Sequence, residues 1–137
     1  MRLTDTQYSE LLRLAKLTRG ASYSPYSHFS VGAALLCRDG SVYTGTNIEN
    51  GSYSATMCAE RVAIFDAVRD GKQELSAVAI VGGADDDDCP DECLPCGVCL
   101  QVMSEFCEGD FEIITEAKDG TWRVHTLDKL MPKRFKL

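Results

Sequence analysis

The chain has 137 residues, of which 45% are hydrophobic, and it carries a formal net charge of −7. A chain of this length buries roughly 68–70% of the surface that its unfolded form exposes, so one domain spanning residues 1–137 with a real core is expected. The acidic balance argues against a nucleic-acid partner, because a phosphate backbone needs clustered Lys and Arg. No apolar run approaches the ~20 residues of a membrane span, so no membrane partner is expected either.

The first residues and the cysteines point to a reducing compartment. Charged and apolar residues alternate near the N-terminus, which is not the pattern of a secretory segment, so a cytoplasmic location is expected. An odd number of cysteines favours metal ligands or core thiols over a disulfide framework. The seven are Cys37, Cys58, Cys89, Cys93, Cys96, Cys99 and Cys107.

The first predicted element is an amphipathic helix over residues 4–19. Thr4 and Gln7 have capping-box spacing, and Gly20 is placed as a C-terminal stop. Apolar residues recur at helical spacing and give the helix one buried face. A turn-rich segment follows at residues 21–29.

The later elements alternate between strands and helices. In chain order they are strands at 31–37 and 42–47 around a hairpin at 38–40, a helix at 58–69, a buried strand at 77–81, an acidic loop at 82–93, a helix starting at 95 or 96, strands at 111–115 and 121–124, and a short helix at 127–131. This order predicts a three-layer α/β/α fold around one sheet of about five strands. The hairpin makes that sheet mixed.

Two short segments carry the chemistry. Cys96 and Cys99 lie three residues apart at a predicted helix start, so both thiols can reach one ion. Cys58 also begins a helix, where the dipole and free N–H groups favour a thiolate. Three thiolates leave one tetrahedral position of Zn²⁺ open, as in a catalytic site. Glu60 is close enough to Cys58 to reach a water molecule in that position, and Arg61 can donate hydrogen bonds to the sulfurs.

Spacing alone leaves other interpretations open. Cys-x-x-Cys also occurs in redox pairs and in structural zinc sites. Cys89, Cys93, Cys96 and Cys99 form a run that could close such a site or hold an iron–sulfur cluster, in a protein without enzymatic activity. That interpretation leaves Cys58 and Glu60 without a role. Cys-x-Glu followed by Pro-Cys-x-x-Cys corresponds instead to the three-cysteine form of the zinc deaminase signature.

Several further motifs extend this match along the chain. They are Tyr-Ser-Pro-Tyr-Ser-His-Phe at residues 23–29, Asn-Ile-Glu-Asn at 47–50, Cys-Ala-Glu-Arg at 58–61, and a Leu-rich ending at 127–135. With these motifs in this order, the chain resembles the cytidine deaminase family, in its small homotetrameric form. The resemblance covers nearly the whole chain.

The resemblance implies hydrolytic deamination of cytidine or deoxycytidine to the uridine product and ammonia, in pyrimidine salvage. Cys58, Cys96 and Cys99 would hold one Zn²⁺ per subunit. Glu60 would shuttle protons to the ring nitrogen and the leaving amine, and Arg61 would hydrogen-bond the thiolates. The residues implied to contact the nucleoside are Phe29, Asn47, Glu49, the Ala59 backbone, and Phe135 of a neighbouring subunit.

The chain departs from the family pattern beside the second cysteine motif. Leu94 replaces a usual Ser, Leu100 replaces a usual Arg, and Gly51 stands where Ala is common. The sequence leaves open what Leu100 and the acidic loop do. A related substrate, such as a blasticidin-type antibiotic or a nucleoside altered at its exocyclic amine, is the main alternative; Glu49, which fits a ribose contact, favours the nucleoside. The negative charge disfavours a polynucleotide substrate.

Overall fold

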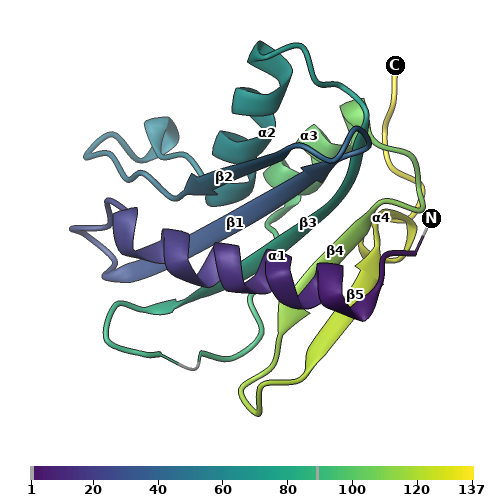
Figure 1. The fold of residues 1–137 in the computed structure, drawn as a ribbon. Helices are drawn as coiled ribbons and strands as arrows, with labels where there is room; N and C mark the ends of the chain where they lie inside the picture. Colours follow the sequence, from purple (N-terminus) through teal and green to yellow (C-terminus); the bar gives the residue numbers. More distant parts are fainter. Residues whose placement is uncertain (1, 89) are drawn as a thin grey trace.

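The computed structural model describes residues 2–88 and 90–137, and its centre is a five-stranded mixed sheet (Figure 1). The strand order is β2-β1-β3-β4-β5. Strand β3 runs parallel to β4, and the other neighbouring strands are antiparallel. The predicted fold class is therefore confirmed.

The helices and strands fall close to their expected places. The strands are β1 (Phe29–Cys37), β2 (Val42–Thr46), β3 (Leu75–Ala84), β4 (Glu112–Glu116) and β5 (Trp122–Thr126). The α-helices are α1 (Asp5–Thr18), α2 (Ala59–Arg69), α3 (Gly97–Phe106) and α4 (Leu127–Leu130). Two short 3₁₀ turns that the sequence did not indicate lie at Arg19–Ala21 and Tyr53–Ala55. Within the described ranges, no helix is both long and apolar enough to cross a membrane.

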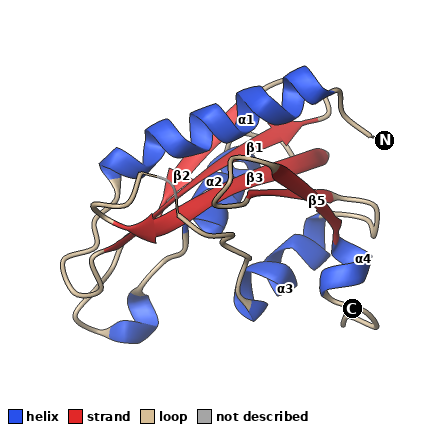
Figure 2. Ribbon diagram, turned by 90° about the horizontal axis from the view of Figure 1, so that it is seen from below, coloured by secondary structure: helices blue, strands red, loops and turns tan. Residues whose placement is uncertain are grey.

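Two apolar layers hold the helices to the sheet. Helix α1 lies along one face, while α2, α3 and α4 lie on the other (Figure 2). On the α1 side, Tyr8, Leu12 and Ala15 pack against alternate residues of the central strands. On the opposite side, the core joins Ile64 of α2 to Met103 of α3. Strand residues alternate between these two cores, as the period of two requires.

Helix α1 begins as the sequence predicts and ends differently. The Gln7 amide donates to the Thr4 hydroxyl, and the Gln7 side chain accepts from the Thr4 amide, which completes the capping box. Gly20 is not a left-handed stop, because the chain continues through it as a 3₁₀ turn. The buried Arg19 guanidinium donates to the carbonyl groups of Ser30, Gly83, Ala84 and Asp87. These bonds hold the helix end to β1 and β3, so no glycine stop is needed.

Strand β3 is longer than the expected residues 77–81, and the expected loop over 82–93 is wrong at its start. Gly82 and Gly83 continue the strand and pair with Val31 and Ser30 of β1. The two glycines make room for the chain that folds back over them. A Cβ at Gly83 would lie 2.3 Å from Pro90, and one at Gly82 would lie 2.8 Å from the Cys93 sulfur.

Gly45 of β2 sets how closely helix α2 approaches the sheet. An added Cβ there would lie 2.4 Å from the Ala59 carbonyl oxygen and 2.6 Å from the Ala63 nitrogen. Both are backbone atoms, so a side chain could be accommodated only if the whole helix moved. The absence of a side chain at Gly45 therefore fixes the first turn of α2 against the strand.

Replacing Gly45 with Ala should destabilise the fold through this clash. We expect Gly45→Ala to lower the free energy of unfolding by about 1–3 kcal/mol, the usual cost of overpacking. Gly20→Ala is the matched control, because nothing lies within 4 Å of its added Cβ. Urea unfolding of both variants checks the prediction, and equal midpoints for the two would contradict it.

Candidate metal centre

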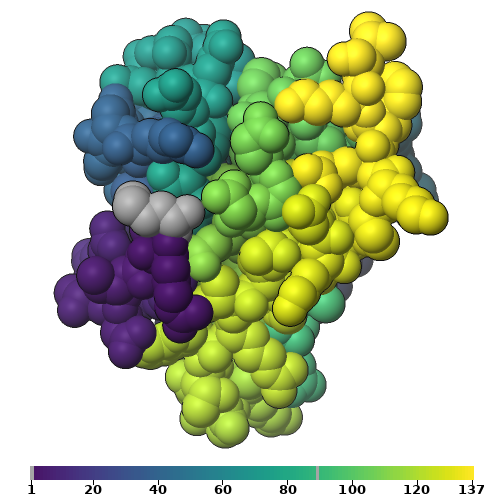
Figure 3. Space-filling model, turned by 90° about the vertical axis from the view of Figure 1, so that its right-hand side faces the viewer, coloured from purple at the N-terminus to yellow at the C-terminus, as the bar shows by residue number. Residues whose placement is uncertain are grey.

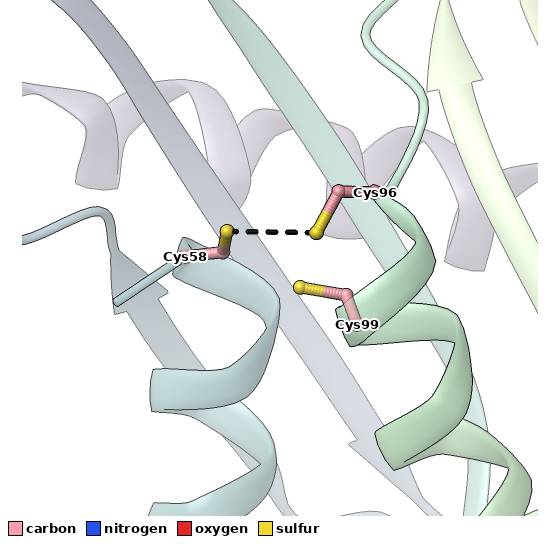
Figure 4. A group of neighbouring side chains, drawn as sticks. All are labelled: Cys58, Cys96 and Cys99. Atoms are coloured by element: carbon pink, nitrogen blue, oxygen red, sulfur yellow. Dashed lines mark hydrogen bonds between the residues drawn. The ribbon is translucent and has the colours of Figure 1, made fainter. Parts of the chain in front are cut away.

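The first turns of α2 and α3 lie side by side on the same face of the sheet, and three cysteines meet between them (Figure 4). Cys58 is the N-cap residue of α2, and Cys96 is the N-cap residue of α3. Cys99 lies in the first turn of α3 and is fully buried. Their three sulfur atoms lie within 4.8 Å of one another. The fold thus brings together the three cysteines singled out in the sequence.

The spacing of these sulfurs fits a tetrahedral zinc ion. Zn–S bonds of about 2.3 Å at tetrahedral angles separate two sulfurs by about 3.8 Å. The Cys58 and Cys96 sulfurs are 3.8 Å apart. Soft thiolates are ligands that zinc prefers, and three of them leave one coordination position open.

The pKa of the Cys58 thiol is lowered to about 5. The largest cause is a hydrogen bond from the Cys99 thiol, and the next favourable cause is Arg61. Two sulfurs that share a proton in this way titrate together, so the pKa of Cys99 is correspondingly raised. Hydrogen bonds from Cys99 and Arg61 therefore favour the Cys58 thiolate, in addition to the helix start that the sequence indicated.

Arg61 brings a positive charge to the sulfurs. Its Nη2 donates to the Cys58 sulfur at 3.3 Å, from one helical turn further along α2. Its Nε is buried and has no hydrogen-bond partner among the described residues. Three thiolates around Zn²⁺ leave one excess negative charge, which a single guanidinium offsets. Leu100, in place of the family's usual Arg, packs against the apolar core instead.

Glu60 lies beside the cluster and is almost completely buried, with 4% of its surface exposed. Burial raises the pKa of its carboxyl group to about 7, and the nearby Cys58 charge adds to the rise. A carboxyl group with this pKa can take up and release a proton near neutral pH. The combination of a metal site and a neutral-range acid–base group is that of a hydrolytic centre.

Asn47 lies just after β2, and its side chain hydrogen-bonds to neighbouring segments of the fold. Its side-chain oxygen accepts from the Val31 amide at 2.9 Å and from the Ser22 hydroxyl. Its side-chain nitrogen donates to the Phe29 carbonyl at 2.8 Å. The second N–H of that amide is the group left to meet a ligand. Ser22 was missed in the sequence, where nothing separates it from the other turn residues.

Glu49 caps the turn that carries residues 24–28. Its carboxylate accepts from the Tyr26 and Ser27 amides at 3.0 and 3.2 Å and from the Ser27 hydroxyl. These donors lower its pKa, with the Ser27 side chain as the largest cause. An ionised carboxylate held in one position by the turn is suited to accept a hydrogen bond from a hydroxyl group.

The remaining predicted contact residues lie in different surroundings. Ala59 is fully buried in the first turn of α2, directly after Cys58. Phe29 opens β1 and is 43% exposed. Phe135 is 66% exposed and lies in the C-terminal segment, whose yellow residues run along the surface (Figure 3). There the Gln101 side chain of α3 donates to its carbonyl oxygen at 3.3 Å.

In the described residues, the cysteines that lie close together in space are not those of the run at positions 89, 93, 96 and 99. Cys93 lies outside the three-sulfur cluster, and its sulfur packs over Gly82. Burial raises the pKa of its thiol to about 11, which favours the neutral form. Cys89 lies outside the described residues. The metal ligands that the fold can offer thus come from two separate segments of the chain.

Fold and site together define a class of protein: an α/β fold in which two helix starts bring together three cysteines that can hold a metal ion, beside a buried acid. The family model for the cytidine and deoxycytidylate deaminase zinc-binding region matches residues 5–115. The chain belongs to this deaminase family.

Individual relatives agree along most of the chain. A cytidine deaminase of Sporosarcina psychrophila is 44% identical over 126 residues, which cover 92% of this chain and 89% of the relative. One from Halalkalibacterium halodurans is 42% identical over 125 residues, covering 91% of each chain. The crystal structure of cytidine deaminase from Burkholderia pseudomallei superposes with a TM-score of 0.85 at 38% identity, covering 97% of this chain and 100% of that one.

Metal content tests which cysteines form the centre. Cys58→Ala should lower the zinc retained after dialysis to well under one ion per chain, because two thiolates remain. Cys107→Ala is the control, since Cys107 is also a buried thiol but lies at the far end of α3. Full zinc occupancy in Cys58→Ala, measured by atomic absorption, would instead support a site built from the four-cysteine run.

Proposed function

We propose that this chain is a zinc-dependent cytidine deaminase, which converts cytidine or deoxycytidine and water to uridine or deoxyuridine and ammonia in pyrimidine salvage. The observation that carries the proposal is the buried Glu60 carboxyl group beside three converging sulfurs. Its pKa of about 7 suits repeated proton transfer. The named activities of the relatives support the same reaction.

One zinc ion per chain would be held by Cys58, Cys96 and Cys99. When bound there, zinc supplies a Lewis acid that makes a water molecule nucleophilic near neutral pH. Glu60 takes a proton from the attacking water and gives it to the ring nitrogen beside C4. As the C4–O bond forms, the second water proton stays on the C4 hydroxyl. Glu60 then takes that proton and gives it to the exocyclic amine, so that the C4–N bond breaks, ammonia leaves and the C4 carbonyl of the uridine product remains. Arg61 keeps the thiolates ionised by donating to Cys58.

The polar side chains before α2 suit a sugar. Among the described residues only one Asn47 amide N–H has a hydrogen-bond partner, and Glu49 offers a fixed carboxylate, so the two can bind ribose hydroxyl groups as donor and acceptor. Phe29 and the Ala59 backbone would hold the base next to Glu60. The net charge of −7 favours this small neutral substrate over a polynucleotide.

Replacing Glu60 with Gln tests the mechanism. Glu60→Gln should retain zinc, because Glu60 is not a ligand, and should lower kcat for cytidine by at least about 10²–10⁴-fold, the usual contribution of a general acid–base group. The fall in ultraviolet absorbance on conversion to uridine gives the rate, and atomic absorption gives the zinc. The carboxylate of Glu105, on the exposed side of α3, provides the control Glu105→Gln. Parental turnover in Glu60→Gln would rule the mechanism out.

We also propose a homotetramer in which Phe135 covers the site of a neighbouring subunit. Phe135 is 66% exposed within this chain, so its side chain is available to contact a neighbouring subunit. Light scattering should give four chains per particle, and Phe135→Ala should raise KM for cytidine several-fold. Leu137→Ala, in the same exposed segment, should leave KM unchanged. A fully active monomer would contradict the proposal.

A further inference from the structure

The loop between β3 and α3 (Figure 1) ends at Cys96, one of the three cysteines proposed to hold zinc. In its described residues, 85–88 and 90–96, this loop contains no helix or strand. Cys99 is buried inside α3, whereas Cys96 is exposed and has the extended backbone of an N-cap residue. The position of the Cys96 sulfur therefore depends on how the loop before it is held. Fixing such a loop costs conformational entropy unless contacts hold it in place.

Glu92, four residues before Cys96, provides such contacts. Its carboxylate accepts a hydrogen bond from the Thr115 hydroxyl of β4. The His125 Nε2 of β5 lies 2.8 Å from the same carboxylate oxygen, and because an ionised carboxylate only accepts, the imidazole is the donor. Arg123 adds a contact of 3.3 Å to the other oxygen.

These partners lie on β4 and β5, which pair with each other in the sheet. Thr115 is fully buried and pairs with Arg123 across the β4–β5 ladder, and His125 lies two residues further along β5. The Thr115 hydrogen bond is the largest cause of the lowered pKa of Glu92, so the carboxylate stays ionised. Only 18% of the Glu92 side chain is exposed, which protects the contact from solvent. A partly buried charge with three donors is a strong attachment point.

The chain between Glu92 and the metal ligand has little freedom left. The Cys93 side chain packs over Gly82 of β3, and Pro95 is buried. Cys96 follows at once and begins α3. Glu92 thus fixes the last stretch of loop from one side, and α3 fixes it from the other.

We propose that Glu92 is a positioning residue for the metal centre: through Thr115 and His125 it fixes the loop that places the Cys96 sulfur opposite Cys58. The inference rests on the zinc site of the proposed function. Residues that orient metal ligands typically change metal affinity by 10–100-fold when they are replaced. Glu92→Ala should therefore release zinc roughly tenfold faster than the parent protein.

The experiment measures zinc release from the loaded, full-length protein to an excess of a chromophoric chelator. Thr115→Val removes the main donor and should accelerate release in the same way. The double variant should be no faster than Glu92→Ala, because Glu92→Ala already removes the contact that Thr115→Val breaks. Asp91→Ala is the matched control, since it removes an exposed carboxylate from the neighbouring position. Its release rate should equal that of the parent.

A second control separates ligand positioning from general loss of stability. Leu12→Ala opens the core under α1, on the opposite face of the sheet from the cysteines, and should lower the melting temperature without touching the loop. If Leu12→Ala accelerates zinc release as much as Glu92→Ala, or if Glu92→Ala releases zinc at the parental rate, the positioning role of Glu92 is wrong. A parent protein that binds no zinc would instead overturn the metal centre itself, and this inference with it.

Discussion

The candidate metal centre depends on the first turns of α2 and α3 lying next to each other. Cys58 and Cys96 each end a segment of irregular chain and begin a helix, and their sulfurs stand 3.8 Å apart. That separation requires α2 and α3 to lie at a fixed distance from the same strands. Gly45 allows α2 to pack directly on β2, while the crossover from β3 to β4 sets the position of α3. An ångström of movement in either helix would open the cluster.

Charge is the second constraint on the same region. Three sulfurs, a carboxylate and a guanidinium lie close together, with Cys99 and Glu60 buried and Cys96 exposed. Hydrogen bonds from Cys99 and Arg61 lower the pKa of Cys58, whereas burial, with the Cys58 charge adding to it, raises the pKa of Glu60. The two shifts differ in sign because hydrogen-bond donors outweigh burial at Cys58, while burial dominates at Glu60. The arrangement can offer sulfurs to a metal beside an acid that titrates near neutral pH.

Two polar residues near the cysteine cluster, Asn47 and Glu49, hold neighbouring segments of the chain in place and keep hydrogen-bonding capacity for a ligand. Asn47 joins the beginning of β1 to the end of β2, and Glu49 caps the adjoining turn. Both side chains are held in place by the fold itself, so little further ordering would be needed to bind the proposed substrate. The loop before α3 is held in a comparable way, by Arg19 near its start and Glu92 near its end.

The sequence by itself determined the order of the elements, the mixed sheet and the cysteines that gather, because these follow from local periodicity, capping and motif spacing. It placed the Thr4 cap correctly, and it named Cys58, Cys96 and Cys99 as the candidate ligands. Only the tertiary structure decided that Gly82 and Gly83 extend β3, since their pairing partners and the chain that covers them come from elsewhere. It also decided the partners of Arg19 and Glu92. A local sequence pattern predicts that a charged residue is exposed. The partners of Arg19 and Glu92 lie on strands that are distant in sequence, so only the folded chain brings them together.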